Sequence, residues 1–180
     1  MSRIRITGGE WRSRLINVID SPGLRPTPDR VRETLFNWLG QHLTGLTCLD
    51  LFAGSGILGF EAASRDAASV VLVERDQRVF ATLRQNATAL GGDRLEVQRS
   101  DALEFAAACS RQGRRFDLVF LDPPYRQSWL ERLWPLLPVI VSPSGRVYVE
   151  AEVVVVPPVP WRVVREGHAG QVFFHLLERE

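Results

Sequence analysis

Acidic and glycine residues follow two apolar runs of this sequence, where they could hold a ligand that contains a nucleoside. Asp50 closes one apolar run and is followed by Gly54, Ser55 and Gly56, and Glu74 closes the next run. Glycines let backbone amides approach a ligand closely at the start of a helix. An acidic residue about twenty positions after the first glycine can accept hydrogen bonds from ribose hydroxyls. The spacing therefore predicts a nucleoside between the two runs.

The glycine pattern alone fits two kinds of ligand. Gly54, Gly56 and Gly59 together with Glu74 also satisfy the dinucleotide-binding fingerprint, so the pattern leaves an NAD-dependent dehydrogenase open. Asp50 favours a different ligand, because its carboxylate would repel a pyrophosphate but attract a ligand with an ammonium and a sulfonium group. A plainer role for Asp50 is a turn-forming carboxylate. We expect the positively charged ligand.

Asp122-Pro123-Pro124-Tyr125 is the most specific motif of the sequence. Two prolines directly after an apolar run keep the backbone extended and without amide donors, so this loop presents acceptors. The Asp122 carboxylate and the Pro123 carbonyl could accept both N–H groups of an aromatic amine, while Tyr125 stacks on its ring. The same residues could also simply end a strand. The motif indicates a site that holds the amine of a nucleic-acid base.

Transfer of a group from a cationic donor to such an amine needs neither a metal nor a general base before the displacement. Positioning of the two reactants supplies most of the acceleration. His42, His168 and His175 are scattered, with no cysteine or carboxylate cluster at ligand spacing, so we predict no metal site.

Strands and helices must alternate after residue 46, as in a parallel sheet joined by crossover helices. We expect strands over 47–51, 69–74, 94–98, 116–121 and 145–150, and helices over 56–64, 76–90, 102–111 and 128–137. Pro135 and Pro138 should kink or end the last helix early. Residues 161–166 and 171–177 alternate in polarity and predict a C-terminal antiparallel hairpin. The predicted fold is α/β: a Rossmann-like, seven-stranded, mostly parallel sheet with helices on both faces.

The amino end differs from this body. Residues 4–7 and 11–16 flank Gly8-Gly9, which predicts a short β-hairpin with a tight turn. We therefore divide the chain into a basic N-terminal hairpin and loop, residues 1–26, and one larger domain, residues 27–180.

A helix should connect the hairpin to the sheet. Thr27 is a good N-cap and Pro28 a good first helical residue. Apolar residues then recur at helical spacing, so we expect the helix to run to about Leu43.

The composition fits a globular protein outside the membrane. A chain of 180 residues can bury a core without metals or disulfides, and no apolar run approaches the ~20 residues of a membrane helix. Residues 1–5 lack the apolar segment of a secretory signal, so we expect a cytoplasmic protein with no membrane partner.

The sequence resembles the class I S-adenosylmethionine-dependent methyltransferases that act on amino groups, through Asp50 to Gly56, Glu74, Asp101 and Asp122 to Tyr125. Residues 5–12 and 23–37 narrow the resemblance to the bacterial RsmD-type family, which methylates guanine N2 in small-subunit (16S) ribosomal RNA. Residues 149–152 and 169–172 also match, so the resemblance covers nearly the whole chain.

The resemblance implies S-adenosylmethionine as the cofactor. Asp50 and the backbone of Gly54 and Gly56 would hold its methionine part. Glu74 would hold the ribose and Asp101 the adenine. The full cofactor-binding set that we expect is Asp50, Phe52, Ala53, Gly54, Ser55, Gly56, Glu74, Arg75, Asp101 and Ala102. The residues that would hold the target guanine are Asp122, Pro123, Pro124 and Tyr125.

Positive charge is concentrated at the amino end. The net charge is only +1, yet residues 1–32 carry seven arginines against three carboxylates. Arginine forms bidentate contacts with phosphate, and such binding weakens steeply with salt. The arginines that we expect to contact RNA are Arg5, Arg12, Arg14, Arg25, Arg30 and Arg32. A solvated surface is the plainer explanation, and Arg30 could instead pair with Glu33 one helical turn away.

The expected partner is small-subunit ribosomal RNA, either naked or within an assembled or assembling subunit, and we expect a monomer. An amine methyltransferase with another acceptor, either adenine N6 or a protein glutamine amide, is the nearest alternative. Enzymes with protein acceptors carry asparagine in place of Asp122 and a helical N-terminal domain that this chain lacks. A non-catalytic RNA-binding or assembly protein is the alternative of another class.

Overall fold

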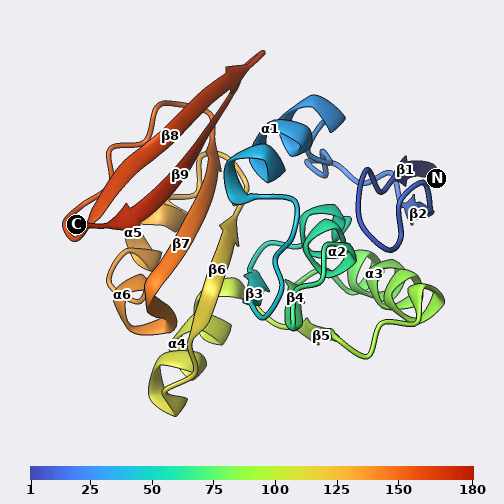
Figure 1. Ribbon diagram of the computed structural model, residues 1–180, viewed down its shortest axis with the longest axis horizontal. Coiled ribbons are helices and arrows are strands. Elements are labelled where there is room, and N and C mark those ends of the chain that lie inside the picture. The colour runs from blue at the N-terminus through green and yellow to red at the C-terminus, as the bar shows by residue number, and fades with distance from the viewer.

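Seven strands form one mixed sheet, and two amino-terminal strands form a separate pair (Figure 1). This computed structural model describes residues 1–180. The strands are β1 (Ser2–Arg5), β2 (Leu15–Val18), β3 (Thr47–Asp50), β4 (Ser69–Glu74), β5 (Leu95–Arg99), β6 (Phe116–Leu121), β7 (Val141–Ala151), β8 (Trp161–Ala169) and β9 (Val172–Arg179). The helices are α1 (Asp29–Leu39), α2 (Ile57–Ser64), α3 (Gln77–Leu90), α4 (Ala102–Gln112), α5 (Trp129–Leu133) and α6 (Leu137–Ile140).

The strand order in the large sheet is β5-β4-β3-β6-β7-β9-β8. The first five of these strands run parallel, whereas β9 pairs antiparallel with both β7 and β8. The chain moves outward from β3 to β5 and then returns to β6 on the other side of β3. Open α/β sheets bind ligands beyond the carboxyl ends of the strands at such a reversal. The predicted seven-stranded α/β fold with a C-terminal antiparallel hairpin is confirmed.

Alternate side chains of the strands face two separate cores. In β3, Cys48 belongs to a cluster of 27 buried residues on one face, and Leu49 to a cluster of 21 on the other. Helices α1, α2 and α3 supply residues to the first cluster, and α4, α5 and α6 to the second (Figure 1). Because the central strands are buried on both faces, they appear in the sequence as nearly continuous apolar runs.

The N-terminal hairpin has a longer connection than the sequence predicted. β1 and β2 pair antiparallel, and residues 6–14 join them. The prediction of a tight Gly8-Gly9 turn was wrong, because these glycines lie against α2. A Cβ atom on Gly9 would lie only 1.9 Å from the backbone oxygen of Ser64, and the amide of Glu10 donates to that oxygen at 2.7 Å. The glycines therefore allow the hairpin loop to approach the helix.

Helix α1 begins and ends differently from the prediction. Thr27 does not cap it: the Thr27 hydroxyl donates to Glu150 Oε1 at 2.8 Å, and the helix has no side-chain cap. The helix also ends earlier, at Leu39, because Gly40 leaves the helical conformation with a φ of 91°.

The remaining differences lie at the ends of elements. The predicted helix over 128–137 is instead two short helices, α5 and α6, with the expected interruption at Pro135. β7 begins at Val141, before its predicted start, β8 extends three residues further than predicted, to Ala169, and β9 begins at Val172 and extends to Arg179, past its predicted end. No helix combines the length and apolarity that a membrane span requires.

A buried ion network fastens the hairpin to α1 and α2. Glu61 is fully buried and accepts from Arg32 Nε at 3.1 Å and from Arg65 Nη1 at 2.7 Å. Its two oxygens also accept from the amide and the hydroxyl of Thr7, at 2.9 and 2.6 Å. Arg32 in turn donates to the backbone oxygen of Arg5 at 2.8 Å. The buried negative charge of Glu61 is therefore matched by two guanidinium groups.

Candidate active site

Three acidic residues meet at the edge of the sheet where β3, β6 and β7 end. Leu121 of β6 lies opposite Val149 of β7, so the residues that follow them, Asp122 and Glu150, are neighbours across the two strands. β3 lies on the other side of β6 and ends at Asp50. The two loops that the sequence singled out, after β3 and after β6, therefore leave the same edge of the sheet.

The loop after β3 depends on glycine at two positions. Gly54 and Gly56 have φ values of 54° and 83°, which favour glycine. A Cβ atom on Gly56 would also lie 2.3 Å from Leu83 Cδ1. Asp50 Oδ2 accepts a hydrogen bond of 3.1 Å from the amide of Gly59 in α2, so this carboxyl group lies underneath the loop.

Glu74 holds a backbone group of this loop, and Asp101 holds the first turn of α4. Glu74 Oε2 accepts from the amide of Gly54 at 3.0 Å, and Oε1 accepts from the amide of Asp76 at 2.9 Å. Asp101 Oδ1 caps α4 by accepting from two of its amides, while Oδ2 lies 3.9 Å from Arg75 Nη1. The structure thus brings Glu74 to the glycine loop and places Arg75 beside Asp101.

The segment between β2 and α1 reaches both loops. A Cβ atom on Gly54 would lie 2.8 Å from Leu24 Cδ1, so this side chain packs on the glycine loop. Tyr125, in the loop after β6, is 42% exposed. Burial and the Asp122 carboxylate raise the pKa of Tyr125, and the nearby Arg25 guanidinium opposes this rise. Leu24 and Arg25 therefore connect the two halves of the site.

The three acidic residues at the sheet edge have no cationic partner. None of the ion pairs of the structure includes Asp50, Asp122 or Glu150. Burial raises the pKa of Asp50 to about 7, and the charges of Glu74 and Glu150 add to the rise. Burial and the Glu150 charge also raise the pKa of Asp122 well above its usual range. A positively charged ligand would favour the ionised form of each of these groups.

Glu150 is a site residue that the sequence prediction missed. It is 4% exposed, and its Oε1 accepts hydrogen bonds of 2.8 Å from the hydroxyls of both Tyr148 and Thr27. The signal that singled out Asp122, an acidic residue at the end of an apolar run, was also present at Glu150. Thr27 carried no such signal, because its partner lies 123 residues away in the sequence.

The arginines predicted to contact RNA have different surroundings. The prediction for Arg32 was wrong: it is 1% exposed, and it belongs to the buried network around Glu61. The others, Arg5, Arg12, Arg14, Arg25 and Arg30, are exposed.

The sequence predicts a strand over residues 11–16, but β2 begins only at Leu15. Arg12 and Arg14 therefore lie in the connection before β2 and not on a strand. Arg14 donates to the backbone oxygen of Ala89 in α3 at 2.9 Å. The ion pair within α1 joins Arg32 to Asp29 and does not involve Arg30.

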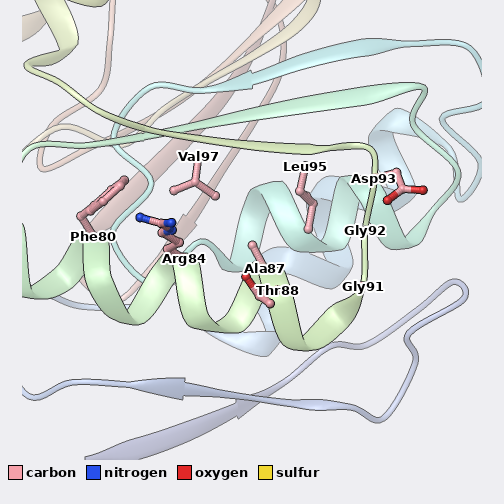
Figure 2. A pocket seen from close by; sticks show the side chains of 9 residues that line it. All are labelled: Phe80, Arg84, Ala87, Thr88, Gly91, Gly92, Asp93, Leu95 and Val97. Atoms are coloured by element: carbon pink, nitrogen blue, oxygen red, sulfur yellow. The ribbon is translucent and has the colours of Figure 1, made fainter.

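A surface hollow of about 410 Å³ lies outside this site, between α3 and β5 (Figure 2). Phe80 and Arg84 of α3 face Val97 of β5 at one end, and Asp93 lies at the other end (Figure 2). None of the residues that line it belongs to the predicted cofactor-binding or base-binding set.

Comparisons with known proteins agree with the resemblance found in the sequence. The family described as Conserved hypothetical protein 95 matches residues 4–178. The chain is 46% identical to Ribosomal RNA small subunit methyltransferase D of Escherichia coli strain K12, over 99% of this chain and 91% of that protein. It is 40% identical to the protein of the same name from Haemophilus influenzae, over 97% and 93% of the two chains. The solved structure of a proposed methyltransferase from Escherichia coli matches with a TM-score of 0.89 and 45% identity, and the match covers 99% of both chains. The chain therefore belongs to the Conserved hypothetical protein 95 family, the RsmD-type family that its sequence resembles.

Proposed function

We propose that the protein transfers a methyl group from S-adenosylmethionine to the exocyclic N2 amine of a guanine in small-subunit ribosomal RNA. The observation that carries the proposal is a group of three carboxyl groups, the buried Asp50 and Glu150 and the partly buried Asp122, which have no cationic partner between the two loops. A ligand with an ammonium and a sulfonium group fits these charges, whereas the pyrophosphate of NAD does not. The names of the relatives from Escherichia coli and Haemophilus influenzae support a ribosomal RNA substrate.

The residues around the glycine loop would hold the cofactor. When bound, it supplies a methyl group on a positively charged sulfur. Asp50 and the backbone of Gly54 and Gly56 would bind its amino-acid part, close to the amide contact that Asp50 already makes. Glu74 would bind the ribose hydroxyls, and Asp101 the adenine through the oxygen that does not cap α4.

The loop after β6 would hold the base. The Asp122 carboxylate and the Pro123 carbonyl would each accept one N–H of the guanine amine, which draws the nitrogen lone pair out of conjugation with the ring. Tyr125 is exposed beside them and would stack on the base. Positioning of the amine against the methyl carbon then supplies most of the acceleration.

The exposed arginines of the amino end would bind the RNA backbone. In this proposal, residues 1–26 form the RNA-contacting part and residues 27–180 the catalytic domain. Because the basic arm is small, we propose that the substrate is RNA already folded in an assembled or assembling small subunit. We also propose that the protein acts as a monomer in the cytoplasm. Arg12 and Arg25 are exposed and are the first candidates for phosphate contacts.

The test is mass spectrometry of nucleosides from small-subunit ribosomal RNA of a strain that lacks this protein. We expect one N2-methylguanosine to disappear, and the wild-type gene to restore it. Asp122→Ala should fail to restore it, because loss of one positioned acceptor costs about 100-fold or more in rate. Asp93→Ala, an exposed carboxylate in the hollow outside the site, is the matched control and should restore it.

Three outcomes of this test would contradict the proposal. Unchanged N2-methylguanosine would remove the substrate assignment, and loss of an N6-methyladenosine would point to the alternative base. Full restoration by Asp122→Ala would favour a non-catalytic RNA-binding protein.

A further inference from the structure

Glu150 has no contact with cofactor or base in the proposed function, yet its carboxyl group is held firmly. Its side chain is buried at the end of β7, directly beside Asp122. Oε1 accepts hydrogen bonds of 2.8 Å from two hydroxyls, those of Thr27 and Tyr148. A carboxyl oxygen has two lone pairs, so these two donors fill Oε1 and leave Oε2 for another partner.

That partner is Asp122, which follows Leu121 and so lies beside Glu150 across the paired ends of β6 and β7, and contact with Glu150 also raises the pKa of Asp122. Ionised carboxylates only accept hydrogen bonds, so a bond between two carboxyl groups needs a proton on one of them. Two carboxylates in contact also repel each other strongly if both are ionised. The two groups therefore carry one negative charge between them and titrate as a pair.

None of the other charged and titratable groups near the pair supplies a positive charge that would let both carboxyl groups ionise. Asp50 adds further negative charge, and the Tyr148 hydroxyl is already bonded to Glu150. Arg25 is exposed and acts on Tyr125. No ion pair compensates either member of the pair.

We propose, resting on the proposed function, that Glu150 is a positioning residue for Asp122. The shared proton ties one Asp122 oxygen to Glu150 and leaves the other oxygen free to accept an N–H of the target amine. As the amine nitrogen bonds to the methyl carbon, the carbon–sulfur bond breaks and its electron pair goes to sulfur. The surplus proton on nitrogen is then lost to solvent, and the pair keeps its one proton throughout.

Amide substitutions test this arrangement, because an amide can replace one member of the pair but not both. In Glu150→Gln, the amide oxygen keeps both hydroxyl donors and the NH₂ group donates to Asp122. In Asp122→Asn, the NH₂ group donates to Glu150 and the amide oxygen faces the target amine. In the double variant, the NH₂ group of the glutamine at position 150 donates to the side-chain oxygen of the asparagine at position 122. The NH₂ group of that asparagine then faces the N–H of the target amine. No side-chain acceptor remains for the target.

The measurement is kcat and KM for the cofactor, with small ribosomal subunits from a strain that lacks this protein as substrate. We expect each single variant to keep kcat within ~10-fold of wild type, and the double variant to lose ~1,000-fold, beyond the product of the single effects. KM for the cofactor should change little. Glu152→Gln, which removes a half-buried carboxylate two residues away, is the matched control and should keep the wild-type kcat.

A double variant whose loss equals the product of the single losses, or a single amide variant that alone loses ~1,000-fold, would overturn the proposal. If the double variant does not fold, Glu150→Ala compared with Glu150→Gln decides. A loss of ~100-fold in the alanine variant with rescue by glutamine supports the proposal, and equal kcat values in the two overturn it. An inactive wild-type protein would contradict the proposed function instead, whereas an active wild type with additive variants contradicts only the role of Glu150.

Discussion

Buried carboxylates in two regions of this protein have opposite surroundings. Around Glu61, where the hairpin meets α1 and α2, the carboxylate contacts the guanidinium groups of Arg32 and Arg65 and accepts two hydrogen bonds from Thr7. At the edge of the sheet, Asp50 accepts one backbone hydrogen bond and forms no ion pair. Glu61 and Asp50 are both buried, but only Glu61 has cationic partners.

This difference separates a structural role from a functional one. A buried charge is costly unless it is paired, so a network that is fully paired can hold two parts of a fold together. A buried charge that stays unpaired lowers stability and is retained where a ligand supplies the missing partner. The network around Glu61 holds the amino end in place, and we propose that a bound cation supplies the missing partner of the carboxyl groups at the sheet edge.

The largest effect should follow from breaking the paired region. Glu61→Ala leaves the buried guanidinium group of Arg65 without a counter-charge and that of Arg32 with only the exposed Asp29, so we expect the free energy of unfolding to fall by about 3–5 kcal/mol. Urea denaturation measures the change, with Glu33→Ala, an exposed carboxylate on α1, as the matched control. A loss no greater than that of the control would show that the network does not hold the hairpin.

A smaller effect of opposite sign is expected in the unpaired region. Without ligand, Asp50→Asn should stabilise the protein at pH 8 by at most a few kcal/mol, because it removes a buried charge that has no partner. The same variant should bind the cofactor at least ~10-fold more weakly, since it removes an attraction to the cationic ligand.

The pH dependence of this stabilisation has a definite sign. Because the pKa of Asp50 is raised to about 7 in the folded protein, the folded state binds more protons than the unfolded state between its ordinary pKa and pH 7. The contribution of Asp50 to wild-type stability should therefore fall as the pH rises through this window, and the advantage of Asp50→Asn should vanish toward pH 4. Parallel curves for wild type and variant would contradict the unpaired burial of Asp50, and Asp93→Asn is the exposed control.

Much of the sheet and of the site edge could be predicted from the sequence. Strands buried on both faces appear as continuous apolar runs, and parallel strands bring their carboxyl ends to one edge. Asp50 and Asp122, each at the end of an apolar run, therefore lie at the same edge of the sheet in the structure.

The remaining features depend on contacts between distant parts of the chain. Arg32 looked like a surface arginine on a helix, but its partner Glu61 lies on another helix, 29 residues away. Gly8-Gly9 fits both a tight turn and a close helix contact, and only the position of Ser64 decides between them. A local pattern cannot contain either partner, so it could predict neither contact.

Calorimetric titration at pH 7, in two buffers with different ionisation enthalpies, tests most directly whether the carboxyl groups at the sheet edge await a cation. S-adenosylmethionine carries one more positive charge than S-adenosylhomocysteine, and the Asp50 carboxyl group, whose pKa is raised to about 7, should ionise when a cation binds beside it. The account predicts that S-adenosylmethionine releases protons from the protein on binding, that S-adenosylhomocysteine releases fewer, and that NAD does not bind. Equal proton release with both ligands, or binding of NAD, would contradict it.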